Sequence, residues 1–352
     1  MISRSRYTIA VPPGETIKEQ LATKDLTQKE LACRLGFSEK HISKLMNGAV
    51  ALTPETAVKL EPVLGIPASF WLGLESNYRK DLAIVKDESE MEDDETLVRK
   101  CPYAECVKHG WLPDTKDIKE RVRALRSYFN VSNLKHLFVP ENALMPRIAF
   151  RCLGDKESIA TAIWVEQAKK RAEKITVEKL DLYRLEQLLP EFREMTKENP
   201  AVFYPKLEKM CASCGIALLT LPCLSGTKLH GASFAWKKRV VLALTVRRKY
   251  ADVFWFSFFH EIGHIIEMHY AQASEDIEKQ EKDADLFARN TLIPPDEYHK
   301  LSFGPLDSSS IRLFAESVDI APGIVVGRLQ KEGKIGYDEL NSLRDKYELK
   351  SA

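Results

Sequence analysis

The spacing of apolar residues changes along the chain and separates helical stretches from a short β-stretch. Between residues 118 and about 209, apolar residues recur every three or four positions, which predicts a mostly helical middle region. Three continuous apolar runs follow at 216–221, 231–236 and 240–245. They predict one strand followed by a β-hairpin.

Helical spacing returns in the C-terminal third of the chain. One stretch runs, with a break, from about 250 to 290, and Pro294-Pro295 is predicted to stop it because proline lacks the amide hydrogen that a helix interior needs. A second stretch runs from 308 to 349, with an interruption at Pro322-Gly323. The pattern therefore predicts a mostly helical chain with one small sheet.

Two short helices joined by a tight turn are predicted near the N-terminus. Thr27 and Glu30 have the spacing of a capping box, in which each side chain binds the backbone amide of the other residue. Gly36 permits the positive backbone angle that ends a helix, and Ser38 can cap the next one. These signals predict a helix-turn-helix. Its inward positions are Leu31, Ala32, Leu35, Ile42 and Leu45.

The outer face of the second helix is polar, and a helix-turn-helix presents this face to base edges and phosphates. An ordinary helical hairpin with a solvated face is the alternative, but the cap, the small residue and the glycine together favour DNA binding. Residues 1–80 carry eleven basic and eight acidic side chains, so an operator is expected to be bound by a homodimer on paired half-sites. The predicted DNA contacts are Gln28, Ser38, Glu39, Lys40, His41, Ser43 and Lys44.

The N-terminal segment, over about residues 8–80, resembles the HigA-like subgroup of phage-repressor-type helix-turn-helix domains. The resemblance is carried by Pro12-Pro13-Gly14-Glu15, the unit 28–45, Leu52-Thr53-Pro54-Glu55-Thr56-Ala57 and Phe70-Trp71-Leu72. It implies an antitoxin or repressor that binds double-stranded operator DNA as a dimer. A toxin is then an expected partner.

The sequence His260-Glu261-Ile262-Gly263-His264 is the strongest chemical signal in the chain. Residues four apart on a helix lie about 40° apart around its axis, so both imidazoles can meet one Zn²⁺ ion with Glu261 beside them. Residues 254–259 are almost entirely apolar and predict a buried helix, in which these polar groups would be costly without a ligand. A core helix with hydrogen-bonded histidines is the alternative.

A third ligand is needed that leaves one coordination position open. Tyr270 stands where a metzincin has its third histidine, so that class is excluded. Downstream, Glu281 and Asp285 lie four residues apart on one helical face. Glu281 is the predicted ligand, and Asp285 is predicted to orient a ligand histidine. Glu278 and Asp283 remain alternative ligands.

Residues 205–300 resemble the ImmA/IrrE metallopeptidases. The resemblance is carried by Phe254-Trp255-Phe256, the motif 260–264, Glu281, Ala284-Asp285, Phe287-Ala288 and Leu292-Ile293-Pro294. It implies that His260, His264 and Glu281 hold Zn²⁺. It also implies cleavage of a repressor, since members of this family are often fused to, or encoded beside, a helix-turn-helix protein.

The predicted reaction is hydrolysis of a peptide bond. Bound Zn²⁺ lowers the pKa of water toward about 7, and Glu261 accepts the proton as the water attacks a peptide carbonyl. The strand at 231–236 is expected to hold an extended substrate if it is an edge strand, and an internal position is the alternative. The oxyanion stabiliser stays open among His230, Tyr270, Tyr298 and His299.

Composition narrows the class of protein. The 352 residues are 44% hydrophobic and 29% charged, with 52 basic and 51 acidic side chains, which excludes a disordered or fibrous chain and gives no global basic field. The apolar run 253–259 is too short to span a bilayer. Seven cysteines do not suggest a secreted disulfide framework, so a cytoplasmic protein with no membrane partner is expected.

Residues 81–95 carry eight acids and one lysine, which predicts an unordered linker; the alternative is the solvated first turn of a helix that starts near Glu92. The predicted fold class is α+β and mostly helical. Its regions are an all-α helix-turn-helix domain (1–80), an acidic linker (81–100), a helical middle region (101–204), a zincin-like metallopeptidase domain with a small antiparallel sheet (205–304) and a helical C-terminal region (305–352).

Three functions are compatible with these signals. The favoured one is a transcriptional regulator whose zinc endopeptidase domain cleaves the chain itself or a partner repressor or antitoxin. The alternative is a DNA-binding antitoxin or repressor whose zincin-like domain is a non-cleaving sensor or partner-binding module. The third is a plain protease that uses its helix-turn-helix only for docking.

Overall fold

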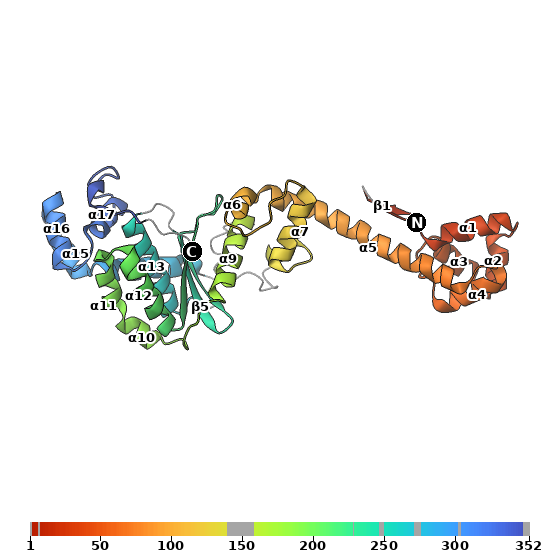
Figure 1. Ribbon diagram of the computed structural model, residues 1–352, viewed down its shortest axis with the longest axis horizontal. Helices are drawn as coiled ribbons and strands as arrows, with labels where there is room; N and C mark the ends of the chain where they lie inside the picture. Colours follow the sequence, from red (N-terminus) through yellow and green to blue (C-terminus); the bar gives the residue numbers. More distant parts are fainter. Residues whose placement is uncertain are drawn as a thin grey trace. The chain divides into compact units, whose positions relative to one another are not determined.

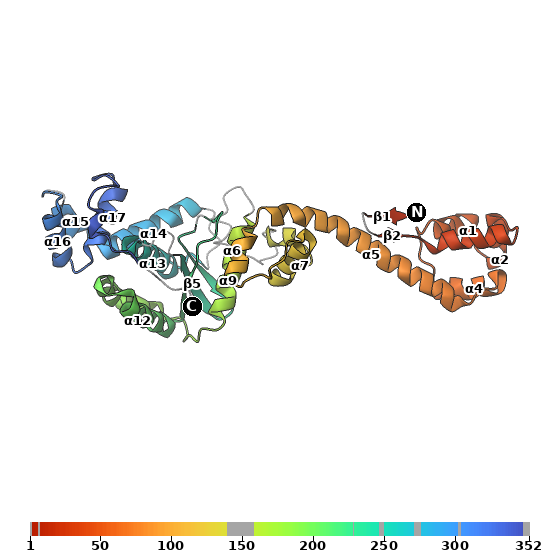
Figure 2. The same ribbon diagram turned by 45° about the horizontal axis from the view of Figure 1, so that its top comes forward.

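The computed structural model describes residues 2–5, 8–138, 158–227, 229–245, 250–270, 276–301 and 304–347. Part of the predicted helical middle region therefore lies outside the described residues. The chain divides into two units, each with its own packing (Figures 1 and 2). Unit 1 comprises Met1–Leu97 and Asp117–Val122, and unit 2 comprises Val98–Lys116 and Arg123–Ala352.

Unit 1 holds a small helical core that is built from the predicted inward positions. Its elements are β1 (Ser3–Arg4), β2 (Ile9–Ala10), α1 (Pro13–Thr23), α2 (Gln28–Leu35), α3 (Glu39–Met46), α4 (Pro54–Leu64) and α5 (Ala68–Arg99). Leu31, Ile42 and Trp71 are fully buried together. Burial of these large side chains holds α2 and α3 against the start of α5.

The predicted caps of α2 and α3 and the turn between the two helices are confirmed. The Glu30 amide donates to Thr27 Oγ1 at 3.2 Å, and the Thr27 amide donates to Glu30 Oε2 at 2.8 Å, which completes the capping box. Gly36 has a φ of 69° at the end of α2. Ser38 Oγ then accepts from the His41 amide at 3.2 Å and starts α3.

The expectation of an unordered acidic segment was wrong, because α5 is one 32-residue helix that continues through it. Apolar burial contributes within the acidic stretch, where Met91 and Leu97 are buried. Ion pairs one turn apart add local support, such as Glu75 with Arg79 at 2.6 Å. The helix begins at Ala68 and not near Glu92, so the alternative was also wrong.

Unit 2 is built around a three-stranded sheet whose order is β3-β5-β4. Its strands are β3 (Ile216–Leu221), β4 (Gly231–Trp236) and β5 (Arg239–Thr245). The predicted β4–β5 hairpin is confirmed, with Trp236 paired to Arg239. However, β3 pairs with β5 in parallel, so the sheet is mixed, not antiparallel. Apolar runs show that strands exist but do not show which edge a preceding strand will join.

Helices cover both faces of this sheet, which explains why β5 is buried along most of its length. Leu242 and Leu244 belong to a core that they share with α12 (Pro200–Ser213) and α13 (Ala251–Ile266). Val241 and Ala243 are equally buried on the opposite face, where α9 (Ile159–Ala172) packs (Figures 1 and 2). The sheet therefore fixes the position of α13.

The remaining described elements are mostly helical, as predicted. They are α6 (Tyr103–Lys108), α7 (Ile118–Phe129), η1 (Leu134–Phe138), α10 (Leu182–Gln187), α11 (Leu189–Glu194), η3 (Met195–Lys197), α14 (Ile277–Leu292), α15 (Pro295–Leu301), α16 (Ser308–Ser317), α17 (Pro322–Lys331) and η4 (Asn341–Leu343). Within the described ranges, each helix is too short or too polar to cross a membrane.

The predicted helix stop at Pro294-Pro295 is confirmed, because α14 ends at Leu292. Pro295 and Pro322 begin helices, since proline fits the first helical turn without losing a hydrogen bond. Between Lys331 and Tyr347 the predicted helix was wrong, and its last two positions lie outside the described residues. Gly333 adopts a φ of 71°, which turns the chain out of the helix, and η4 is the one helical turn described after it.

Two glycines in unit 1 provide a test of its packing. A Cβ on Gly14 in α1 would lie 1.9 Å from the Met46 carbonyl oxygen, whereas a Cβ on Gly73 in α5 would meet nothing within 4 Å. We expect Gly14→Ala to destabilise unit 1 by about 1–3 kcal/mol or more through overpacking. Gly73→Ala should stabilise it by about 0.5–1 kcal/mol.

The measurement is amide hydrogen exchange of α1 to α4 in the full chain, because exchange reports the stability of each unit separately. Equal protection in the two variants would show that α1 does not pack tightly on the end of α3.

Candidate metal centre and helix-turn-helix

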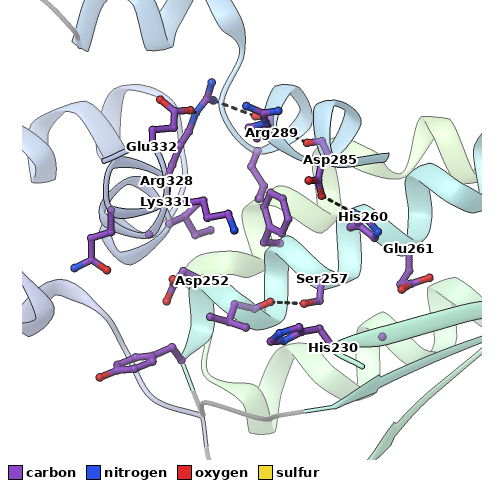
Figure 3. A pocket seen from close by; sticks show the side chains of 18 of the residues that line it. His230, Asp252, Ser257, His260, Glu261, Asp285, Arg289, Arg328, Lys331 and Glu332 are labelled. Carbon is purple, nitrogen blue, oxygen red and sulfur yellow. Dashed lines mark hydrogen bonds and ion pairs between the residues drawn. The ribbon is translucent and has the colours of Figure 1, made fainter. Parts of the chain in front are cut away.

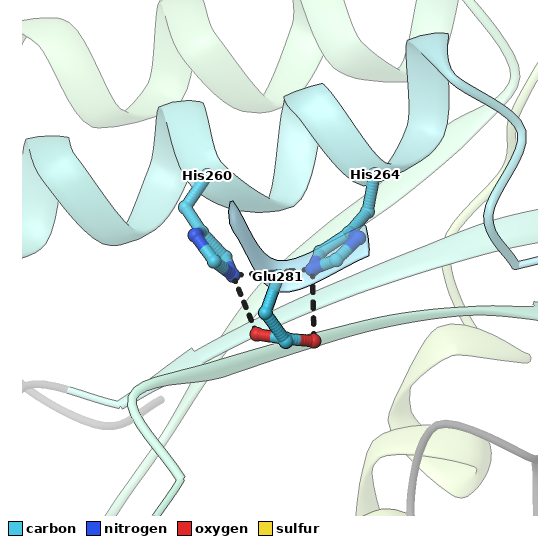
Figure 4. A group of neighbouring side chains, drawn as sticks. All are labelled: His260, His264 and Glu281. Carbon is cyan, nitrogen blue, oxygen red and sulfur yellow. Dashed lines mark hydrogen bonds and ion pairs between the residues drawn. The ribbon is translucent and has the colours of Figure 1, made fainter. Parts of the chain in front are cut away.

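Two helices of unit 2 bring the predicted metal ligands together. His260 and His264 lie one turn apart on α13, and Glu281 comes from α14. The two helices cross closely because Gly263 has no side chain at the crossing: a Cβ there would lie 3.0 Å from the Phe287 ring. The tips of the three side chains face one another (Figure 4).

The distances in this cluster match those around one tetrahedral metal ion. His260 Nε2 lies 3.3 Å from Glu281 Oε2, His264 Nε2 lies 3.3 Å from Glu281 Oε1, and the two Nε2 atoms lie 3.1 Å apart. A tetrahedral ion with bonds of ~2.1 Å separates its ligand atoms by ~3.4 Å. The three residues therefore fit a metal ion. The alternative ligand Glu278 pairs instead with Lys282 at 2.6 Å, and Asp283 is exposed.

The Asp285 carboxylate contacts His260, one of the two predicted histidine ligands. Its Oδ1 accepts a hydrogen bond from His260 Nδ1 at 2.8 Å. Nδ1 therefore carries a proton, which leaves Nε2, the ring atom that faces the centre of the cluster, available to bind a metal ion. The carboxylate is on the same face of α14 as Glu281, one turn further along.

His269 makes the corresponding contact with His264, and this contact was not predicted. The two Nδ1 atoms lie 2.9 Å apart, so one of them donates a hydrogen bond to the other. Met268 adopts a φ of 55° just after α13, and the His269 amide donates to the His264 carbonyl at 2.9 Å. This left-handed end turns the chain back onto the helix.

The electrostatics of the cluster favour a cation. Burial lowers the pKa of His260, but hydrogen bonds to Asp285 and Glu281 outweigh it and raise that pKa to about 10. Burial raises the pKa of Glu281, but the two imidazoles hold it well below its usual range. Three carboxylates, those of Glu261, Glu281 and Asp285, thus surround two imidazoles and stabilise positive charge between them.

Glu261 is buried beside this cluster with an unused oxygen. Its side chain is 5% exposed, and Oε2 has no hydrogen-bond partner among the described residues. A Cβ on Gly231 would lie 2.9 Å from Oε1, so the glycine at the start of β4 leaves room for the carboxylate in this position. A buried, unpaired carboxylate oxygen is costly in a folded protein. It indicates a position for a water molecule or a substrate group.

A cleft of about 1220 Å³ opens in front of these residues (Figure 3). The triad, Glu261 and the start of β4 line it. β4 lies at an edge of the three-stranded sheet, in agreement with the first of the two alternatives drawn from the sequence. Of the oxyanion candidates, His230 lines the cleft, whereas Tyr270, Tyr298 and His299 do not.

The predicted DNA contacts of unit 1 lie on its accessible surface. Gln28, Ser38, Glu39, Lys40 and Lys44 are exposed, and His41 and Ser43 are half-buried. The Ser38 hydroxyl is already engaged as the cap of α3. The His41 ring stacks obliquely on Phe37 with 4.8 Å between centroids. This contact limits how far the imidazole can reach.

Comparisons with known proteins concern this first unit. A family described as helix-turn-helix matches residues 17–71. An uncharacterized HTH-type transcriptional regulator of Escherichia coli (strain K12), YddM, is 36% identical over 64 residues, which are 18% of this chain and 68% of that protein. The chain belongs to the helix-turn-helix family. Residues 17–71 thus form a helix-turn-helix DNA-binding domain.

A solved structure of an addiction module antidote protein of a HigA family from Coxiella burnetii is also similar to the helix-turn-helix part. It is 29% identical and covers 24% of this chain and 92% of its own, with a TM-score of 0.22. The helix-turn-helix family match ends at residue 71. The family match therefore says nothing about the metal centre, which rests on the geometry of its residues.

The hydrogen bond between Asp285 and His260 allows a test of the metal centre. We expect Asp285→Ala to weaken Zn²⁺ binding about 10- to 100-fold, because the imidazole loses the partner that fixes its tautomer. Asp283→Ala removes an exposed carboxylate from the same helix and should leave the affinity unchanged. Competition with a chromophoric chelator measures both; equal affinities would show that Asp285 does not support the metal ligand.

Proposed function

We propose that this protein is a DNA-binding transcriptional regulator with a zinc-dependent endopeptidase domain. Its substrate would be a peptide bond in the chain itself or in a partner repressor or antitoxin. The observation that carries the proposal is the His260, His264 and Glu281 cluster, with separations of 3.1–3.3 Å. The buried Glu261, with one unpaired oxygen, lies beside it.

Zn²⁺ is the metal that this donor set suits best. Two imidazole nitrogens and one carboxylate at tetrahedral separations are the usual ligands of a catalytic zinc ion, and three protein ligands leave a fourth position open. When bound, Zn²⁺ would supply a Lewis acid that polarises a carbonyl and acidifies water. Asp285 and His269 would hold the two imidazoles in the orientation that this binding needs.

The remaining chemistry belongs to the chain's own residues. Glu261 would accept a proton from the attacking water and deliver it to the leaving nitrogen. The edge of β4 would hold the substrate extended through backbone hydrogen bonds, and Gly231 allows that backbone to come close to Glu261. His230 lines the cleft next to β4 and is our candidate for stabilising the carbonyl oxygen as it gains charge.

The helix-turn-helix domain would bind a double-stranded operator as a homodimer in the cytoplasm. Capped α2 and α3, the exposed face with Lys40 and Lys44, and the family match support this role. The name of the E. coli relative describes a transcriptional regulator. The resemblance to HigA-like domains makes a toxin a candidate partner.

Glu261→Gln separates catalysis from binding. We expect cleavage to fall by about 100-fold or more, because the amide cannot accept a proton, while Zn²⁺ and DNA affinity stay unchanged. Intact-mass spectrometry would follow the zinc-loaded chain alone and with the repressors or antitoxins encoded beside its gene. Glu267→Gln, an exposed glutamate just after α13, is the matched control.

If the zinc-loaded wild-type chain cuts neither itself nor any of these partners, the endopeptidase proposal is wrong. The domain would then act as a non-cleaving sensor or partner-binding module of an antitoxin or repressor.

Lys40→Ala and Lys44→Ala test the DNA-binding face. Each should weaken operator binding and reduce the slope of log affinity against log salt by about 1, since one phosphate contact is lost. Fluorescence anisotropy on the promoter upstream of the protein's own gene, at several salt concentrations, measures both effects. Lys209→Ala, an exposed lysine of α12, is the control. If both variants bind the promoter as tightly as the wild type, the result favours a protease that uses its helix-turn-helix only for docking.

A further inference from the structure

The wall of the cleft that lies away from β4 is rich in basic side chains. Arg289 comes from α14, Arg328 and Lys331 come from α17, and Arg344 follows η4. Figure 3 shows Arg289, Arg328 and Lys331 on the same side of the cleft, with His260 and Glu261 on the other side.

Two of the four cations are held by carboxylates. Arg344 forms a two-point pair with Asp252, at 2.8 Å and 3.1 Å. Arg328 Nε lies 3.0 Å from Glu332 Oε1, and that carboxylate also accepts from the Tyr298 hydroxyl at 2.5 Å. These pairs are structural, and they use both acids on this wall.

Arg289 and Lys331 are not matched in this way. The neighbouring Asp285 is engaged by His260, and Arg289 Nε makes only a long contact, 3.5 Å, to the Asp285 carbonyl oxygen. Over the described ranges, the ion pairs of the cleft include neither Arg289 nor Lys331. This wall therefore presents two positive charges that no described carboxylate of the cleft neutralises through an ion pair.

The position of these charges follows from the helices that carry them. Arg289 lies eight residues after Glu281 on α14, so it is ~12 Å further along the helix axis. Arg328 donates to the carbonyls of Arg289 at 3.2 Å and Ile293 at 3.0 Å, which fixes α17 against the end of α14. Lys331 is one turn beyond Arg328, on the same face of α17.

We propose that Arg289 and Lys331 form a subsite for an aspartate or glutamate side chain of the peptide substrate. An extended peptide advances ~3.3 Å per residue, so the acidic residue lies three or four positions from the bond held at the metal centre. Arginine can bind a carboxylate through two parallel hydrogen bonds. This proposal rests on the proposed peptidase function and specifies its substrate class.

A peptide library tests the subsite. The zinc-loaded full chain is incubated with peptides derived from a whole proteome, and the cut bonds are identified by mass spectrometry. We expect acidic residues to be enriched at least twofold three or four positions from the cut. The enrichment should disappear in Arg289→Gln/Lys331→Gln and change to basic residues in Arg289→Glu/Lys331→Glu. Lys209→Gln is the control.

These substitutions should leave the fold intact, because Arg328 binds the backbone carbonyl of Arg289 and not its side chain. Wild-type cleavage without acidic enrichment at those positions, or with enrichment that the variants keep, overturns the proposal.

A binding arm separates this proposal from the peptidase proposal. If the wild-type chain cuts nothing, the zinc-loaded Glu261→Gln variant is titrated with two fluorescein-labelled heptapeptides that differ only in three aspartates or three asparagines. The subsite predicts at least fivefold tighter binding of the aspartate peptide, lost in Arg289→Gln/Lys331→Gln. Equal binding of the two peptides overturns the subsite, whatever the fate of the peptidase.

Discussion

The metal centre depends on the close crossing of α13 and α14 at Gly263. A Cβ at this position would lie 3.0 Å from the ring of Phe287, so this ring or α14, which carries Glu281, would have to shift by a few tenths of an ångström. The separation of 3.3 Å between this carboxylate and each imidazole thus relies on a missing side chain. Because two helices in contact are rigid, the ligand positions are set before any ion arrives.

The same crossing explains why so much charge can be buried in an apolar region. α13 packs on the sheet through Phe254, Phe258 and their neighbours, and this burial offsets the cost of removing His264 and Glu261 from water. The imidazoles keep hydrogen bonds to Asp285 and His269. Glu261 Oε2 alone among these groups lacks a partner in the described structure, at the point where chemistry would need it.

Local signals in the sequence predicted what depends on local geometry. The capping box at Thr27, the turn at Gly36 and the placement of two histidines one turn apart follow from helix geometry alone. The proximity of Glu281 to the two histidines depends on where a second helix lies. Residue spacing does not give that position, and the family resemblance pointed to Glu281 instead. The partner of His264 was missed because it depends on a left-handed residue, Met268. The helical order of residues 81–95 within α5 was missed because amino-acid composition does not account for the backbone hydrogen bonds that stabilise a helix.

One helix, α14, sets both the site and its selectivity. It supplies Glu281 and Asp285 to the metal centre and, two turns later, Arg289 to the far wall of the cleft. A helix cannot stretch, so the rise of ~12 Å along α14 between Glu281 and Arg289 is fixed. A substrate with its acid one residue too near or too far would have to bend away from β4 and lose backbone hydrogen bonds. The cleft would therefore discriminate between peptide substrates by the position of the acidic residue as well as by its presence.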